Sequence, residues 1–157
     1  MKQAIFIGLA AGILIGAAQY VSMTGTYTGT LGGLLYYSPL LIFFASIYVA
    51  IKRTRDSSED QLTFKIGLKT GGVASLIICL IWGIAFFIAL THQNVREFMN
   101  YKIANHQESE IPQYLRAFSN RQTYFDMTKF WVMPNFLLGF LITVMATIFL
   151  LKRQKAK

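Results

Sequence analysis

The side chains that could carry chemistry in this chain gather in one stretch, residues 91–129, which holds His92, His106, Glu108, Glu110 and Asp126. Imidazole and carboxylate groups are common ligands of Zn²⁺ and common general acids and bases. His106, Glu108 and Glu110 are two residues apart, a spacing that gathers side chains on one face of a strand but spreads them around a helix. Because the apolar residues of this stretch have helical spacing, we expect no metal site here.

Other signatures of catalysis are missing from the sequence. It has no glycine-rich phosphate loop, no nucleophile elbow and no pair of zinc ligands at helical spacing. Cys79 is the only cysteine, so no disulfide can form within the chain. We therefore expect a protein that is not an enzyme and that needs no cofactor.

Coupled transport would require a different feature, an ionisable side chain deep inside the membrane. None lies deep in an apolar stretch of this chain. Gln19 is the most polar residue of the first stretch, and Lys65 and Lys69 lie where their side chains can extend to a membrane surface. A transporter or channel subunit is therefore the alternative rather than the favoured function.

The distribution of charged residues along the chain indicates the elements of the fold that hold these side chains. Of the 157 residues, 54% are apolar and only 14% are charged, and residues 3–51, 70–95 and 130–151 carry no charge at all. A helix crosses the hydrocarbon core of a bilayer with about 20 apolar residues. A soluble domain of this size would need charges on every helix. The pattern predicts an integral membrane protein.

The longest charge-free stretch holds two crossings, because its middle, residues 22–30 (SMTGTYTGT), has the composition of a tight turn. The predicted spans are about 4–21, 31–51, 70–90 and 130–151. The small residues 16–18 could also end a signal peptide, but the length of the first apolar run favours an uncleaved span. We predict an all-α protein with a single domain, residues 1–157: a four-helix transmembrane bundle with an additional helical segment, about 91–129, outside the membrane between spans three and four.

Basic residues predict the orientation, because Lys and Arg concentrate in cytoplasmic loops. The turn at 22–30 has no Lys or Arg. The segment 91–129, which we call the outward segment, is nearly balanced in charge. Ten basic residues fall on the other side of the predicted membrane: Lys2, Lys52, Arg53, Arg55, Lys65, Lys69, Lys152, Arg153, Lys155 and Lys157. Both termini are expected in the cytoplasm. The net charge of +8 is explained by these membrane borders, so we expect lipid rather than nucleic acid as the partner of the basic residues.

Small residues recur every four positions in three of the spans, a spacing that places them on one helix face. Such a face is a groove that a neighbouring helix can enter closely, either from the same chain or from a second copy in a homo-oligomer. The sequence leaves both readings open. The candidate helix-packing residues are Gly8, Gly12, Gly16, Gly67, Gly71, Ser75, Gly83 and Gly139.

The outward segment contains an apolar stripe that begins at Val95 and follows helical spacing. A second helical piece begins at Pro112. These helices either lie on the membrane surface, where aromatic rings settle at the level of the headgroups, or form a binding surface for a protein, peptide or lipid. The candidate outward-surface residues are Phe98, Met99, Ile103, Tyr114 and Phe118.

The whole chain resembles the bacterial membrane proteins grouped as domain of unknown function forty-one ninety-nine, found chiefly in Bacteroidetes. The distinctive residues are the linker 51–56 (IKRTRD) and the following 62–71 (LTFKIGLKTG). The four-span plan, the glycine-rich first span and a last span that ends in Lys152 and Arg153 add to the resemblance. It implies an uncleaved first span and a bacterial inner-membrane location, and it implies no activity.

The sequence therefore predicts an inner-membrane protein with a non-enzymatic role. We expect an accessory or scaffold protein that binds a partner through the outward segment or the small-residue grooves.

Overall fold

The computed structural model describes residues 2–25, 29–57, 62–93, 95–97 and 121–155. These residues form four long helices: α1 (Lys2–Thr24), α2 (Gly29–Ser57), α3 (Phe64–Thr91) and α6 (Arg121–Lys155). All four are long and apolar enough to cross a membrane. The predicted all-α fold class with four membrane-spanning helices is confirmed.

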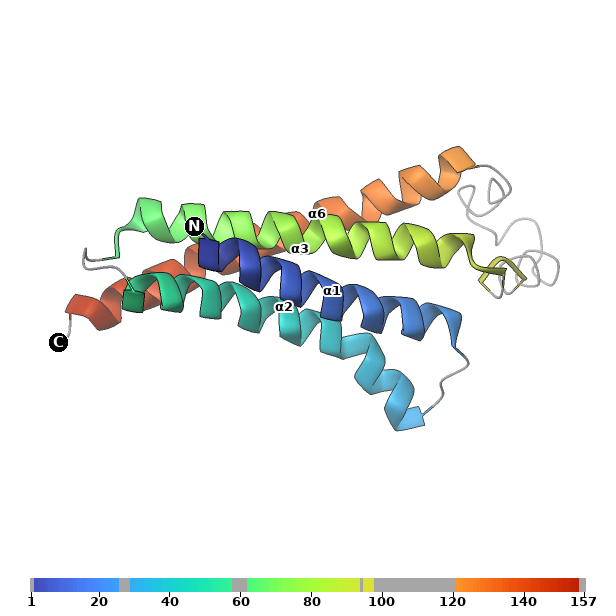
Figure 1. The fold of residues 1–157 in the computed structure, drawn as a ribbon, viewed down its shortest axis with the longest axis horizontal. Coiled ribbons are helices and arrows are strands. Elements are labelled where there is room, and N and C mark those ends of the chain that lie inside the picture. The colour runs from blue at the N-terminus through green and yellow to red at the C-terminus, as the bar shows by residue number, and fades with distance from the viewer. Residues whose placement is uncertain (1, 26–28, 58–61, 94, 98–120, 156–157) are drawn as a thin grey trace, which may run out of the picture.

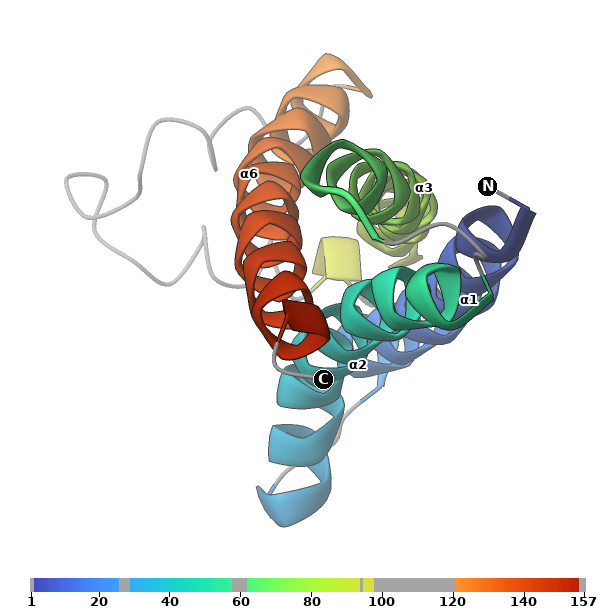
Figure 2. The ribbon, with the colours of Figure 1, turned by 90° about the vertical axis from the view of Figure 1, so that its left-hand side faces the viewer.

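The helices form an up-and-down bundle in which α3 packs against α1, α2 and α6. Figure 2 shows α1 and α6 on opposite sides of α3, with α2 beside α1. The chain begins and ends at the same end of the bundle (Figure 1). We call this the terminal end, and the end where α3 stops and α6 begins the distal end.

The start and stop of α3 follow from local hydrogen bonds. Thr63 caps its first turn, since the Thr63 hydroxyl oxygen accepts a hydrogen bond from the backbone N–H of Ile66 at 3.3 Å. At the other end, His92 has extended backbone angles, and its N–H donates to the carbonyl oxygen of Ala89 at 3.1 Å. The helix therefore ends at Thr91, at the edge of the apolar stretch.

The helices extend beyond the predicted spans, and the difference is largest at the start of span four. Residues 121–129 were expected in a segment separate from span four, but they are the first turns of α6, which continues without a break to Lys155. Nothing in 121–129 stops a helix, since glycine and proline are missing from it. Charge marks where the apolar part of a span begins, which is not where a helix has to begin.

The core runs along the bundle axis and consists of apolar side chains from all four helices. Its largest fully buried members include Phe43, Ile47, Ile78 and Leu150. A second, smaller cluster at the distal end joins the end of α3 to the start of α6, and its buried residues are Leu90, Val95 and Tyr124.

Proline occurs inside two of the helices, at Pro39 in α2 and Pro134 in α6. Both helices continue past it, although proline lacks the backbone donor that the regular ladder requires. Figure 1 shows that α2 bends and that its N-terminal part leads away from the rest of the bundle. Pro39 itself is fully buried. A proline inside a helix is a usual cause of such a bend.

Candidate functional site

The glycines of α1 lie directly against α3. A Cβ atom built on Gly8 would be 3.1 Å from Cβ of Ile77, and one built on Gly12 would be 2.8 Å from Cδ1 of Ile81. At Gly16 the nearest atom would be Cβ of Ala85, at 3.0 Å. The three glycines are buried on one face of α1. This face is therefore a groove that α3 already fills.

The interface between α3 and α6 also places glycines against side chains of the neighbouring helix, and two of these side chains are threonines rather than isoleucines. Gly67 faces the side chain of Thr147, and Gly71 faces Thr143, whose Cγ2 would be 2.5 Å from an added Cβ. Further along α3, Gly83 faces Val132, also at 2.5 Å. Each of these three glycines of α3 thus receives a β-branched side chain of α6.

One glycine of α6 reverses the arrangement. A Cβ on Gly139 would meet the hydroxyl of Ser75, and Cζ of Phe43 would lie only 2.7 Å from it. All the candidate helix-packing residues therefore lie at contacts between helices of one chain. A second copy could enter these grooves only by displacing α3 or α6.

The polar side chains buried in the bundle are small and uncharged. Those of the described residues are Thr70, Ser75, Thr143 and Thr147. The hydroxyl of Thr143 donates to the carbonyl oxygen of Gly139 at 2.8 Å, and that of Thr147 to the carbonyl oxygen of Thr143 at 2.7 Å. Because both hydroxyls are used by their own helix, they are poorly placed to bind a substrate.

A layer of aromatic rings joins the helices toward the distal end. The rings of Phe43 and Trp82 meet edge to face at 6.0 Å between centroids, and those of Trp82 and Trp131 do so at 5.8 Å. Phe86 stacks on Trp131 at 5.2 Å. The indole N–H of Trp82 donates to Oε1 of Gln19 at 3.3 Å, so the most polar residue of the first span is a partner for a buried tryptophan.

The hydrogen bond between Trp82 and Gln19 was not predicted from the sequence. A signal was present, because a tryptophan inside an apolar stretch needs an acceptor for its N–H, and Gln19 is the one long polar side chain in the first span. The layer fills the interior and holds α1 to α3.

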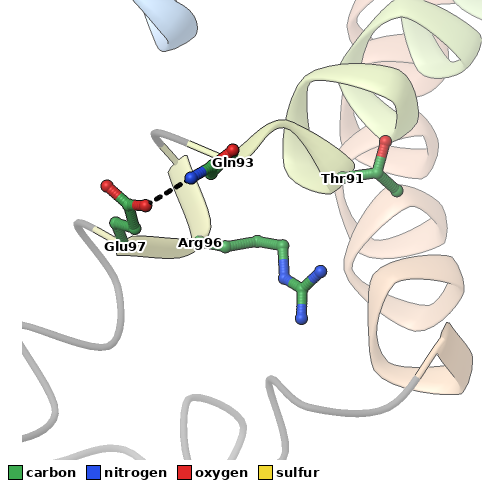
Figure 3. Close-up of a pocket in the computed structure, with 4 residues that line it drawn as sticks. All are labelled: Thr91, Gln93, Arg96 and Glu97. Carbon is green, nitrogen blue, oxygen red and sulfur yellow. Dashed lines mark hydrogen bonds between the residues drawn. The ribbon is translucent and has the colours of Figure 1, made fainter.

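A shallow pocket of about 330 Å³ opens at the distal end, lined by Thr91, Gln93, Arg96 and Glu97 (Figure 3). The amide of Gln93 donates to Oε1 of Glu97 at 2.8 Å. Arg96 is exposed, its side chain points away from Glu97, and its guanidinium group makes no hydrogen bond or ion pair with any residue of the described ranges. The pocket therefore presents a guanidinium group that has no ion-pair partner among the described residues, together with a carboxylate that accepts a hydrogen bond from Gln93.

Val95, which precedes Arg96 in the chain, attaches the pocket to the bundle. Its side chain is only 7% exposed and packs with Leu90 and Tyr124. Its burial agrees with the predicted apolar stripe, which begins at this residue. The remaining candidates of the outward segment lie outside the described residues: Phe98, Met99, Ile103, Tyr114, Phe118, His106, Glu108 and Glu110. In the part of the chain that the structure describes, no group of three His, Cys, Asp or Glu residues could hold a metal ion.

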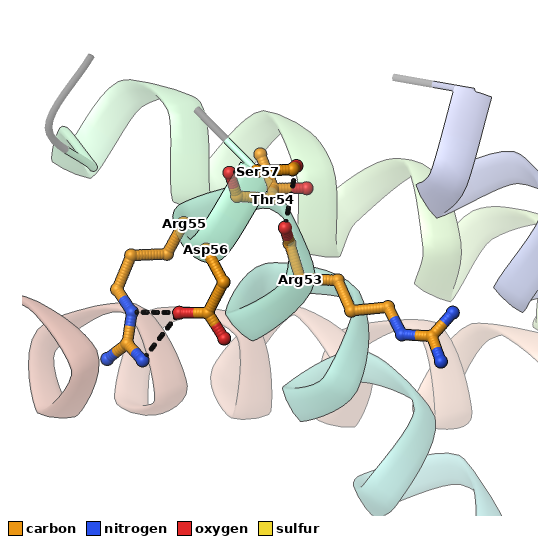
Figure 4. Close-up of polar contacts among 5 residues, drawn as sticks. All are labelled: Arg53, Thr54, Arg55, Asp56 and Ser57. Carbon is orange, nitrogen blue, oxygen red and sulfur yellow. Dashed lines mark hydrogen bonds and ion pairs between the residues drawn. The ribbon is translucent and has the colours of Figure 1, made fainter. Parts of the chain in front are cut away.

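The terminal end of the bundle differs from the distal end in that it has an excess of positive charge. Arg55 forms an ion pair with Asp56 at 2.7 Å, and the hydroxyl of Ser57 donates to the carbonyl oxygen of Arg53 at 2.7 Å (Figure 4). The side chain of Arg53 extends away from this pair. Six basic side chains at this end have no carboxylate partner among the described residues: Lys2, Lys52, Arg53, Lys65, Lys69 and Lys152.

Four apolar helices around a closely packed interior define a small multi-pass membrane protein whose outer faces contact lipid. The chain belongs to the family described as "Protein of unknown function (DUF4199)", which matches residues 2–152. This match confirms the resemblance drawn from the sequence. Comparisons with curated proteins and with solved structures give no match.

Proposed function

We propose that this protein is a non-enzymatic accessory or scaffold protein of a bacterial inner membrane, with both termini in the cytoplasm, and that it binds a protein partner at its distal end. The observation that carries this proposal is the pocket around Arg96 and Glu97. Its charged side chains are exposed, and Val95 fixes their backbone to the bundle. Charged groups on a fixed frame favour specific docking, because little conformational entropy is lost on binding.

The interior of the bundle supports a binding role over a transport role. The small-residue grooves are filled by helices of the same chain, and the buried polar side chains of the described residues are uncharged. A coupled transporter would use an ionisable group at such a position. The distal end is therefore the better candidate for the functional surface, and a transporter or channel subunit remains the alternative that an experiment must exclude.

The test is co-purification of the partner with the tagged full-length protein after extraction in a mild detergent. We expect the double variant Arg96→Ala/Glu97→Gln to reduce the amount of a partner by roughly tenfold or more, as for loss of a charged contact at an interface. The control is Asp126→Asn/Lys129→Ala, which removes another exposed pair of opposite charge and should leave the partner bound.

Two outcomes would contradict the proposal. If both double variants retain the partner equally, the pocket is not the binding surface. If the purified protein alone, reconstituted in liposomes, gives substrate-dependent flux, the protein is a transporter.

The predicted orientation has its own test, cysteine labelling in intact cells in a Cys79→Ala background. Gln93 and Ser57 are exposed at opposite ends of the bundle. Because basic residues concentrate at the terminal end, an impermeant maleimide should label Gln93→Cys in intact cells and Ser57→Cys only after permeabilisation. The reverse labelling would place both termini outside.

A further inference from the structure

One face of α3 is largely exposed over residues 65–80. It carries five residues at intervals of three or four, which places them within one stripe of the helix surface: Lys65, Lys69, Gly72, Leu76 and Leu80. All but Gly72 are exposed, and Gly72 is half-buried. Gly67 and Gly71, which meet α6, lie on the other side of the helix. We call these five residues the α3 stripe, and it faces away from the bundle interior.

Gly72 is not explained by packing within the chain. The three other glycines of α3 (Gly67, Gly71 and Gly83) each face a side chain of α6, but a Cβ on Gly72 would meet nothing within 4 Å. Glycine inside a helix is destabilising relative to alanine. A glycine at an open surface position leaves a depression in the helix surface, here between Lys69 and Leu76.

The two lysines lie at the membrane border of the same stripe. They are four residues apart, so both ammonium groups can reach a single anion. Neither forms an ion pair with a carboxylate of the described residues. Exposed lysines near the end of a span attract the phosphate groups of anionic lipids.

The dimensions of the stripe match one leaflet of a bilayer. From Lys69 to Leu80 the helix rises by roughly 16 Å, and half of the hydrocarbon core is about 15 Å thick. Leu76 and Leu80 are 47% and 54% exposed, so an acyl chain lying along the stripe would pass over Gly72 and contact both leucines.

We propose that the α3 stripe is a binding site for one anionic phospholipid. The phosphodiester headgroup binds Lys65 and Lys69, and an acyl chain lies over Gly72 against Leu76 and Leu80. The general preference of cytoplasmic loops for basic residues accounts for the lysines alone. It accounts neither for the open glycine nor for its alignment with them.

The test is a titration of the full-length protein, purified in a neutral detergent, with phosphatidylglycerol and with phosphatidylcholine, followed by native mass spectrometry to count bound lipid. We expect one phosphatidylglycerol to bind, with a Kd roughly tenfold or more below that of phosphatidylcholine. The variant Lys65→Gln/Lys69→Gln should raise the Kd for phosphatidylglycerol by roughly tenfold or more. The control Lys52→Gln/Lys152→Gln removes the same charge from the same end and should change it by less than about twofold.

A second variant tests the acyl-chain contact separately from charge. Gly72→Leu fills the depression from a Cβ position that has no atom within 4 Å, so it should weaken phosphatidylglycerol binding while the Tm in detergent is maintained. Gly33→Leu, at another open glycine, should leave binding unchanged. Equal effects of the two lysine pairs, no effect of Gly72→Leu, or full competition by inorganic phosphate at the lipid's concentration would each overturn the proposal.

Discussion

Replacing Gly71 by alanine is expected to lower the free energy of unfolding by about 2–3 kcal/mol, whereas the same change at the adjacent Gly72 should leave it unchanged or raise it by up to about 1 kcal/mol. A Cβ on Gly71 would lie 2.5 Å from Cγ2 of Thr143 and 2.9 Å from Cδ1 of Ile51. Both contacts are too short to persist, so Thr143 of α6 and Ile51 of α2 must shift away from α3. At Gly72 the methyl group enters open space, and alanine favours the helix.

The comparison of Gly71→Ala with Gly72→Ala is informative because the two variants differ only in which side of α3 receives the methyl group. Thermal or denaturant unfolding of the full-length protein in a neutral detergent measures both. A second change, Thr143→Ala in the Gly71→Ala background, removes the principal clash and should restore part of the lost stability, which a double-mutant cycle would quantify. Equal stabilities of Gly71→Ala and Gly72→Ala would show that α6 does not pack on this face.

The variant Trp82→Ala should destabilise the bundle by about 3 kcal/mol or more, the range for removing a buried large aromatic side chain. Trp82 is only 4% exposed and contacts Phe43 and Trp131, and its N–H donates to Gln19. Its removal leaves a cavity between α2, α3 and α6 and leaves the Gln19 side chain without this donor. In lipid this loss of packing matters more than the apolar transfer term, because the surroundings are already apolar.

Unfolding in detergent again provides the measurement, and tryptophan fluorescence adds a local one. The chain has two tryptophans, so emission of Trp82→Ala reports on Trp131 alone and should change as that ring loses its partner. The control is Phe130→Ala, which removes an aromatic ring that is 83% exposed and should cost less than about 0.5 kcal/mol. If both variants were equally stable, the aromatic layer would not hold the helices together.

The number and approximate position of the membrane-spanning helices followed from the sequence alone. The requirement for about 20 consecutive apolar residues is local, so stretches without charge reveal it directly. The spacing of small residues was local information of the same kind. It distinguished Gly71, which belongs to the series of every fourth residue, from its neighbour Gly72, which does not.

The candidate functional site was predicted only in part. Val95 was expected at the start of an apolar stripe, and its burial against Leu90 and Tyr124 agrees with that. The exposed Arg96 in a pocket with Glu97 was not expected, since a charged residue in a polar segment gives no sign of whether a partner lies beside it. Span four was predicted to begin at about residue 130, and the helix that contains it, α6, begins earlier, at Arg121.

Only the tertiary structure decided which helix fills which groove. Gly8, Gly12 and Gly16 could have received a second copy or any other span, and they receive α3. The hydrogen bond from Trp82 to Gln19 joins residues 63 positions apart, and Gly72 is distinguished from the packed glycines by the lack of any atom beside it. The physical reason is that residue spacing defines the face of a single helix, whereas the partner of that face depends on how all the helices pack together.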